Sequence, residues 1–246
     1  MDGSVLALFL FATFVGAVVS GIAGFAFGLV VSGVWLHVLQ PSQFAVMIVI
    51  TGLVTQGYGI WKVRRSIRWR TLAPFVIGGA IGIPIGTALL SYADPARMRL
   101  GIGVLLIAYS LYNLARPNLK PVTPSAATDG AAGALNGLLG GLTGLGGVVV
   151  TVWCQLRGGT KDAQRAIYQP AIFATFVMTT ISLAVAGAVT VPTLKLFATS
   201  LPVLLAGLWI GVHLYGKLDD AAFRKLVLIL LLVSGVTLVL PLPDLI

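Results

Sequence analysis

Long apolar stretches follow one another along almost the whole chain, and only short connections separate them. Of the 246 residues, 58% are hydrophobic and 9% are charged. A helix needs about 20 apolar residues to cross a hydrocarbon core of roughly 30 Å. The pattern therefore predicts an all-α integral membrane protein with no room for a separate soluble domain. The eight stretches run roughly over residues 5–39, 44–61, 72–92, 100–114, 131–156, 167–191, 194–215 and 222–240.

The basic residues indicate membrane orientation rather than a nucleic-acid partner. Net charge is +9, which in a soluble protein would suggest nucleic-acid binding. Here Lys and Arg lie in short loops between apolar stretches, where they set topology. The lone Cys154 allows no internal disulfide, and the first residues lack the basic region of a cleaved signal peptide. We expect a multi-pass protein of a bacterial inner membrane, in contact with the lipid bilayer and with no nucleic acid.

The two halves of the chain resemble each other. A proline-rich linker at residues 116–128 separates a first membrane repeat, 1–115, from a second, 129–246. At an offset of 120, Gly21 and Gly24 fall on Gly141 and Gly144, and at an offset of 125, Gly82, Gly86, Leu89, Asp94, Ala96 and Arg99 fall on Gly207, Gly211, Leu214, Asp219, Ala221 and Arg224. The Asp and Arg matches carry most weight, because Gly and Leu coincidences are expected in apolar sequence. We interpret the pattern as a duplicated unit.

The distribution of Lys and Arg favours one topology over another. If all eight stretches cross the membrane, each side receives eight basic residues, against the positive-inside bias. If the first stretch of each half is a hairpin that returns to its own side, the counts become thirteen and three. Residues 5–39 as one straight helix would also measure about 52 Å, beyond the hydrocarbon thickness. We therefore predict inverted halves with both termini facing away from the cytoplasm; for residues 131–156 a single tilted span stays open.

Each predicted hairpin contains a glycine cluster at which we expect the helix to break. The clusters occupy residues 21–28 and 140–147, and neither has the strand-loop-helix context of a nucleotide-binding loop. Glycine in a helix interior costs about 1 kcal/mol relative to alanine. Helices broken at mid-membrane would aim unpaired N–H groups and positive dipole ends at an anion; close packing of small residues is the alternative. The cluster residues expected at a substrate site are Gly24, Thr143, Gly144, Gly146 and Gly147.

Neutral polar side chains within the apolar stretches supply the other candidate ligands. Gln56 and Gln169 are costly to bury, and their amides can donate to sulfonate or carboxylate oxygens. Tyr168 is the neighbour of Gln169, and Arg165 lies a short helix path away on the same face. Interhelical hydrogen bonding is the alternative explanation for such residues, and we favour it for the threonines.

The acidic residues argue against several other functions. All seven are aspartates, and each falls in a connection or near the end of a stretch. A cation carrier or a carboxylate proton relay usually has a carboxylate at mid-membrane. The sequence also lacks metal-ligand spacing and a nucleophile with its base, so we expect no metal, no cofactor and no enzyme. An integral-membrane enzyme and an assembly factor without transport activity stay as alternatives.

One continuous run points to a family. The sequence WCQLRGGTKDAQRAIYQP at residues 153–170, following GLGG at residues 144–147 and joined by IGIPIG at residues 81–86, resembles the TauE/SafE sulfite exporter family, also called the toluene-sulfonate uptake permeases. The resemblance covers nearly the whole chain. It implies transport of small anions such as sulfite or organosulfonates, which we expect to proceed by alternating access; a homodimer stays open.

Two features qualify what this resemblance implies about the site. In the first glycine cluster, Phe25 and Phe27 stand where the second has Leu145 and Gly147, so the halves need not contribute equally. In the predicted topology, a basic group lies at the cytoplasmic mouth of the second hairpin, where it would concentrate anions. It consists of Arg157, Lys161 and Arg165.

Overall fold

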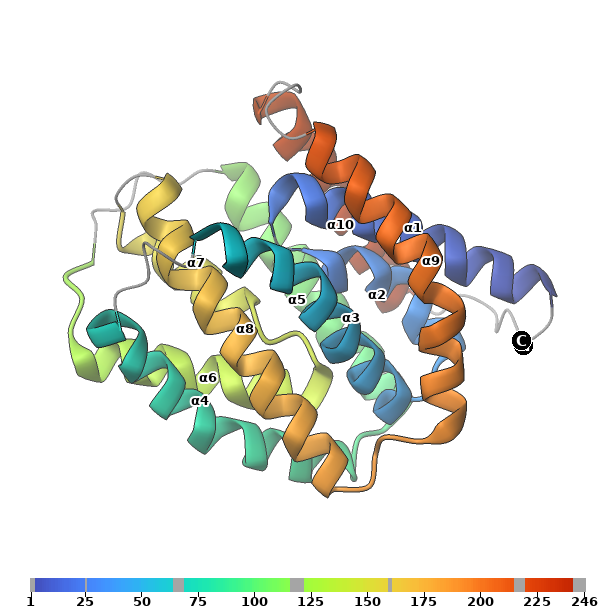
Figure 1. The fold of residues 1–246 in the computed structure, drawn as a ribbon, viewed down its shortest axis with the longest axis horizontal. Helices are drawn as coiled ribbons and strands as arrows, with labels where there is room; N and C mark the ends of the chain where they lie inside the picture. The colour runs from blue at the N-terminus through green and yellow to red at the C-terminus, as the bar shows by residue number, and fades with distance from the viewer. Residues whose placement is uncertain are drawn as a thin grey trace. The chain divides into compact units, whose positions relative to one another are not determined.

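The computed structural model describes residues 3–24, 26–63, 69–115, 122–158, 161–214 and 220–240, and all regular secondary structure in these ranges is α-helical (Figure 1). The helices are α1 (Gly3–Ala23), α2 (Phe27–Val38), α3 (Pro41–Val63), α4 (Trp69–Leu90), α5 (Pro95–Ala115), α6 (Ala126–Thr143), α7 (Val148–Leu156), α8 (Lys161–Val185), α9 (Val191–Leu214) and α10 (Asp220–Val239). The predicted all-α class is confirmed. The first and fifth apolar stretches each hold two helices, and each of the others holds one.

Both double stretches break at the predicted glycine clusters. Gly24 follows α1 with φ of 76°, and Gly144 follows α6 with φ of 77°. The N–H of each donates to the carbonyl four residues earlier, Ser20 and Gly140 respectively, and both distances are 2.7 Å. This left-handed conformation favours glycine, because a Cβ would clash there. The two helices therefore end in the same way, at positions that the repeat aligns.

Each break turns the chain back on itself. In the first hairpin, the rings of Phe9 and Trp35 stack with centroids 4.9 Å apart, and a Cβ added to Gly16 would lie 2.6 Å from Val31 Cγ1. Pairs of residues progressively farther from the break therefore meet, so α1 and α2 are antiparallel. In the second hairpin, Val150 at the start of α7 donates its N–H to Asn136 of α6. Each cluster thus separates two helices that pack on each other, while the return of either hairpin to its own side of the membrane stays a prediction.

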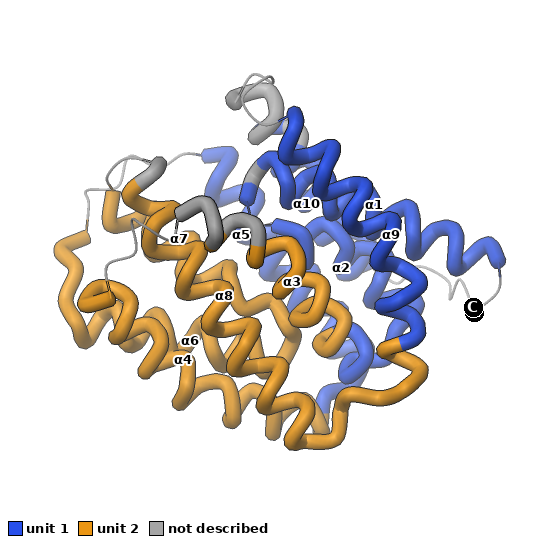
Figure 2. Tube along the Cα trace, in the orientation of Figure 1, with its two compact units in different colours: residues 1–44, 93–118, 195–246 blue, residues 45–92, 119–194 orange. Residues whose placement is uncertain are grey.

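The helices form two compact units (Figure 2). Unit 1 comprises Met1–Phe44, Ala93–Asn118 and Lys195–Ile246, and unit 2 comprises Ala45–Tyr92 and Leu119–Leu194. Unit 1 thus combines α1, α2 and α5 with α10 and most of α9, whereas unit 2 combines α4 and most of α3 with α6, α7 and α8. Each unit draws helices from both halves of the sequence. The repeat boundaries at 1–115 and 129–246 stay a prediction, and residues 116–121 of the linker lie outside the described ranges.

In unit 2, α4 packs along α6 through glycines. A Cβ added to Gly82 would meet the carbonyl oxygen of Ala134, and one added to Gly86 would meet that of Leu138. Gly141 likewise faces the carbonyl of Ile83. Since only a hydrogen atom stands at each position, the two backbones come into direct contact, as in close helix packing within membranes.

Unit 1 repeats this contact between α1 and α9. A Cβ added to Gly207 would lie 2.7 Å from the carbonyl oxygen of Phe14, and one added to Gly211 would meet the carbonyl of Val18. Gly21 faces the carbonyl of Leu208 at 2.8 Å from the added Cβ. Each of these positions maps onto its counterpart in unit 2 by the offset of 120 or 125 seen in the sequence. The hairpin of one half therefore packs on the third apolar stretch of the other half.

Candidate functional site

The break between α6 and α7 uses most of its N–H groups internally. The N–H of Leu145 donates to Thr143 Oγ1 at 3.1 Å, that of Gly146 to the Gly144 carbonyl at 2.8 Å, and that of Gly147 to the Leu145 carbonyl at 2.9 Å. The N–H groups of Gly144, Gly146 and Gly147 are thus engaged within the described turn, and a place for these glycines at a substrate site stays a prediction. They allow a turn tight enough to restart the helix at once.

The free donors belong instead to the first residues of α7. Gly147 makes no side-chain cap, and within the described ranges the N–H groups of Val148 and Val149 reach no acceptor. The next N–H, of Val150, donates to Asn136 Oδ1 at 3.4 Å. Two unpaired N–H groups and the positive end of the helix dipole thus coincide at the break. Sequence reasoning missed both valines, because an apolar side chain gives no sign of a free backbone donor.

Asn136 connects the break to α8. Its amide nitrogen donates to the Gly146 carbonyl at 3.2 Å and to Thr175 Oγ1 at 3.2 Å, and Thr175 in turn donates to the Ala171 carbonyl. All donors and acceptors of the Asn136 amide are therefore directed at the backbone turn and its neighbour. This side chain fixes the position of the free N–H groups relative to α8.

Gln169 on α8 is buried with an unpaired amide. The side chain is 1% exposed, and neither Oε1 nor Nε2 has a hydrogen-bond partner in the described part of the chain. Leaving such a group unpaired costs about 1–3 kcal/mol, so its presence calls for an explanation. Gln169 lies one turn before Ile172, whose Cδ1 would lie 3.0 Å from a Cβ on Gly147. The unpaired amide therefore lies on the helix face that packs on the break, one turn away from that contact.

The first hairpin presents different side chains at its break. Ala26 adopts φ of 76° before α2 begins, and Phe27 and Leu29 are buried directly after it. The nearby hydroxyl of Ser32 donates to the carbonyl of Gly28 within its own helix. Phe25 lies outside the described residues. The described side chains beside this break are thus apolar or bonded within their own helix, while the N–H groups of Phe27, Gly28 and Leu29 also reach no acceptor within the described ranges.

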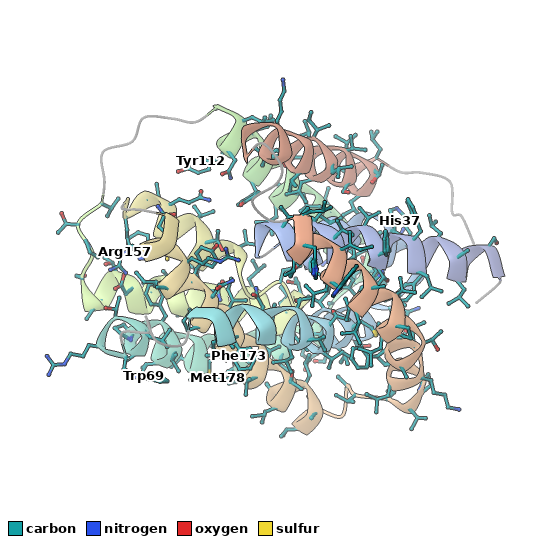
Figure 3. The ribbon with its side chains drawn as sticks, turned by 45° about the horizontal axis from the view of Figure 1, so that its top comes forward. His37, Trp69, Tyr112, Arg157, Phe173 and Met178 are labelled. Atoms are coloured by element: carbon teal, nitrogen blue, oxygen red, sulfur yellow. The ribbon has the colours of Figure 1, made fainter. Side chains whose placement is uncertain are left out.

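A buried ion pair joins the two helices of the second hairpin at the end away from the break. Nη1 of Arg157 lies 2.9 Å from both carboxylate oxygens of Asp129, and Trp153 Nε1 donates to Oδ1 at 2.8 Å. Arg157, labelled in Figure 3, is the C-cap residue of α7. Asp129 lies in the first turn of α6. Sequence reasoning placed both near stretch ends but did not pair them. An antiparallel hairpin centred on the break would have brought them together.

The comparisons identify the family. The family description "Sulfite exporter TauE/SafE" matches residues 8–238. The chain belongs to the TauE/SafE sulfite exporter family. Curated proteins and solved structures give no significant match. The resemblance inferred from the sequence is confirmed, and the matched region of this TauE/SafE protein includes both breaks and every candidate residue named above.

The helices of this TauE/SafE protein fit its place in a membrane transporter family. Five helical segments among the described residues are long and apolar enough to span a bilayer, as expected of a multi-pass protein. They are Gly3–Ile22, Trp69–Leu90, Pro95–Ala115, Ala163–Val185 and Val191–Leu214. Two shorter apolar helices cover Phe27–Val38 and Val227–Val239.

Most of the predicted site residues of the TauE/SafE protein belong to one unit. Unit 2 holds Gln56, Thr143, Gly144, Gly146, Gly147, Arg165, Tyr168 and Gln169, whereas Gly24 belongs to unit 1. Gln56 is buried on α3, and Arg165 is half-buried on α8. Tyr168 is partly buried against a cluster that includes Phe75 and Val150. The side chain of Lys161 lies outside the described set.

Proposed function

We propose that this TauE/SafE protein carries a small oxyanion, sulfite or an organosulfonate, across a bacterial inner membrane by alternating access. The observation that carries the proposal is the combination of two N–H groups at the α6–α7 break, from Val148 and Val149, that reach no acceptor in the described ranges, with the unpaired buried amide of Gln169 one helix turn from the contact of α8 with that break. All three are neutral. They suit an anion that must bind and then leave, since a buried cation would hold it more tightly.

The chemistry of the break favours an oxygen-bearing anion. Backbone N–H groups at a helix start and the Nε2 of Gln169 are donors that reach oxygen atoms directly, and the helix dipole adds a partial positive charge. Ile172, against Gly147, and Val150 supply apolar surface beside these donors. Such surface suits the carbon chain of an organosulfonate, whereas sulfite needs the donors alone.

Alternating access is supported by the repeated contacts. The α1–α9 contact and the α4–α6 contact use positions related by the same offsets, so the chain contains two copies of one packing arrangement. In inverted-repeat transporters, such copies rock against each other around a substrate site built from broken helices. The counts of thirteen and three basic residues on the two sides favour the inverted arrangement.

Uptake into proteoliposomes tests the proposal. Purified protein is reconstituted, and uptake of labelled sulfite, sulfoacetate and taurine is measured with and without a pH gradient. We expect uptake of at least one of these, reduced at least about tenfold by Gln169→Ala because the amide donor is lost. Thr180→Ala is the matched control, since the hydroxyl of Thr180 on the same helix donates to the carbonyl of Phe176 within that helix.

The same experiment separates the alternatives. An integral-membrane enzyme or an assembly factor predicts no uptake of any of the three anions by the wild-type protein. Uptake by Gln169→Ala at the wild-type rate would instead leave a transporter in place but remove Gln169 from its site. A parallel test of Gln56→Ala shows whether α3 also contributes to binding.

A further inference from the structure

We propose that Arg157 forms a second oxyanion contact at the open end of the α6–α7 hairpin, and that Asp129 keeps this contact weak enough for release. The ligand is taken to be the transported anion, so the inference rests on the function proposed above. The open end is the end of the hairpin that contains the Asp129–Arg157 ion pair, away from the break at Gly144.

The ion pair holds Arg157 in a fixed place. Nη1 contacts both oxygens of Asp129 at 2.9 Å, and the indole of Trp153 donates to the same carboxylate. The guanidinium carbon lies 5.9 Å from the centroid of the Phe75 ring, at the outer limit of a cation–π contact. The side chain of Asp129 is only 7% exposed. A charge-assisted pair in such surroundings orders both side chains.

This arrangement leaves donors of Arg157 unused. A guanidinium has five N–H donors, but within the described residues only those on Nη1 reach an acceptor. Nη2 and Nε of Arg157 are not fully buried, whereas Nε of Arg99 is buried without a hydrogen-bond partner among the described residues. The side chain retains 15% exposure. The Nε–Nη2 edge, which meets no acceptor among the described residues, has the geometry that binds two oxygens of a sulfonate or sulfite at once.

Asp129 sets the strength of this contact through its charge. A lone guanidinium in a partly buried position would attract an anion strongly and release it slowly. The carboxylate against Nη1 cancels most of that attraction without occupying the other edge. Conduction along a transport path requires sites that bind well enough to admit the solute and weakly enough to pass it on.

A purely structural role for the ion pair is the competing explanation. The first hairpin argues against it, because Phe9, the counterpart of Asp129 at an offset of 120, fastens that hairpin by stacking on Trp35. Stacked rings therefore suffice to join the two arms of such a hairpin. A charged pair is not needed for closure alone.

Two variants distinguish these roles in the full-length protein. Arg157→Lys keeps a cation beside Asp129 but removes the second donor edge. Asp129→Asn keeps an acceptor for Trp153 and Arg157 but removes the compensating charge. The readouts are the KM and maximal rate of sulfite uptake into proteoliposomes and the thermal unfolding midpoint in detergent.

We expect Arg157→Lys to keep the wild-type unfolding midpoint and raise KM at least about tenfold. We expect Asp129→Asn to lower KM several-fold and to reduce the maximal rate, because release is slowed. Wild-type KM in Arg157→Lys, or a raised KM in Asp129→Asn, would overturn the assignment while leaving the function at Gln169 intact. Absence of uptake by the wild-type protein would contradict both this assignment and the proposed function.

Discussion

Gly21 of α1 packs directly against Gly211 of α9, because a Cβ added to Gly21 would lie 2.9 Å from the Gly211 Cα. Their counterparts by sequence offset, Gly141 and Gly86, meet in unit 2, with 3.1 Å between the added Cβ and the Gly86 carbonyl carbon. In each unit, one glycine comes from a hairpin and the other from the opposite half of the chain. The halves are therefore interlocked through backbone contacts that no larger residue can make.

Substitution of Gly86 should unfold unit 2 locally or prevent its assembly. A valine side chain at this position would overlap the carbonyl of Leu138, so the backbone of α4 or α6 would have to move. Such overpacking lowers the free energy of unfolding by about 1–3 kcal/mol or more. We expect Gly86→Val to lower the amount of folded protein recovered from membranes and its unfolding midpoint. Gly101→Val is the control, because an added Cβ there meets nothing within 4 Å. Equal behaviour of the two variants would contradict the packing described.

The two sequence halves should fold only together. Unit 2 takes α4 from the first half and α6 to α8 from the second, and unit 1 is composed in the same mixed way. We expect fragments 1–118 and 119–246 to be degraded when expressed alone and to be recovered as a complex when co-expressed. Protein levels in membranes and co-purification measure this. Stable accumulation of either fragment by itself would show that the exchange of helices is not required.

Asn136 should stabilise the break more than any polar residue that bonds within its own helix. Asn136→Ala removes the partners of the Gly146 carbonyl, the Val150 N–H and Thr175 Oγ1, which predicts a loss of about 2–4 kcal/mol. We expect a lower unfolding midpoint and loss of uptake. Thr180→Val serves for comparison and should unfold near the wild-type temperature. An unchanged unfolding midpoint in Asn136→Ala would mean that the turn is stable without the hydrogen bonds of this side chain.

The inverted arrangement predicts where the chain ends. With thirteen basic residues on the cytoplasmic side and three on the other, both termini face away from the cytoplasm. We therefore expect activity from a C-terminal fusion to a reporter enzyme that works only outside the cytoplasm. A cytoplasm-specific reporter at the same position is the control. Activity of the cytoplasmic reporter would refute the topology.

The sequence predicted the features that depend on local chemistry. The breaks at Gly24 and Gly144 were foreseeable because left-handed backbone and tight turns favour glycine, and clusters of it are visible in the chain. The unpaired amide of Gln169 was foreseeable as a costly buried group in an apolar stretch. The bond from Asn136 to Thr175 was not, because it depends on how α6 and α8 are placed. The exchange of helices between halves depends likewise on contacts between distant segments.

Two parts of the candidate site were missed for identifiable reasons. Val148 and Val149 contribute through their backbone, and side-chain chemistry does not reveal which N–H groups a turn leaves free. Asp129 was placed with the connections, because its partner Arg157 is distant in sequence. The signal was available in the hairpin geometry. Positions equally far from the break on either side must meet when the arms are antiparallel.

The most direct measurement of the central claim is sulfite uptake by Gln169→Glu in proteoliposomes. This substitution keeps the size of the side chain but places a carboxylate on the face of α8 that packs on the break, one turn from the contact with Gly147, where it would repel the substrate anion. We predict that uptake falls at least about a hundredfold while the unfolding midpoint and the amount of reconstituted protein stay near wild type. Uptake at the wild-type rate would show that the anion does not bind at the α6–α7 break.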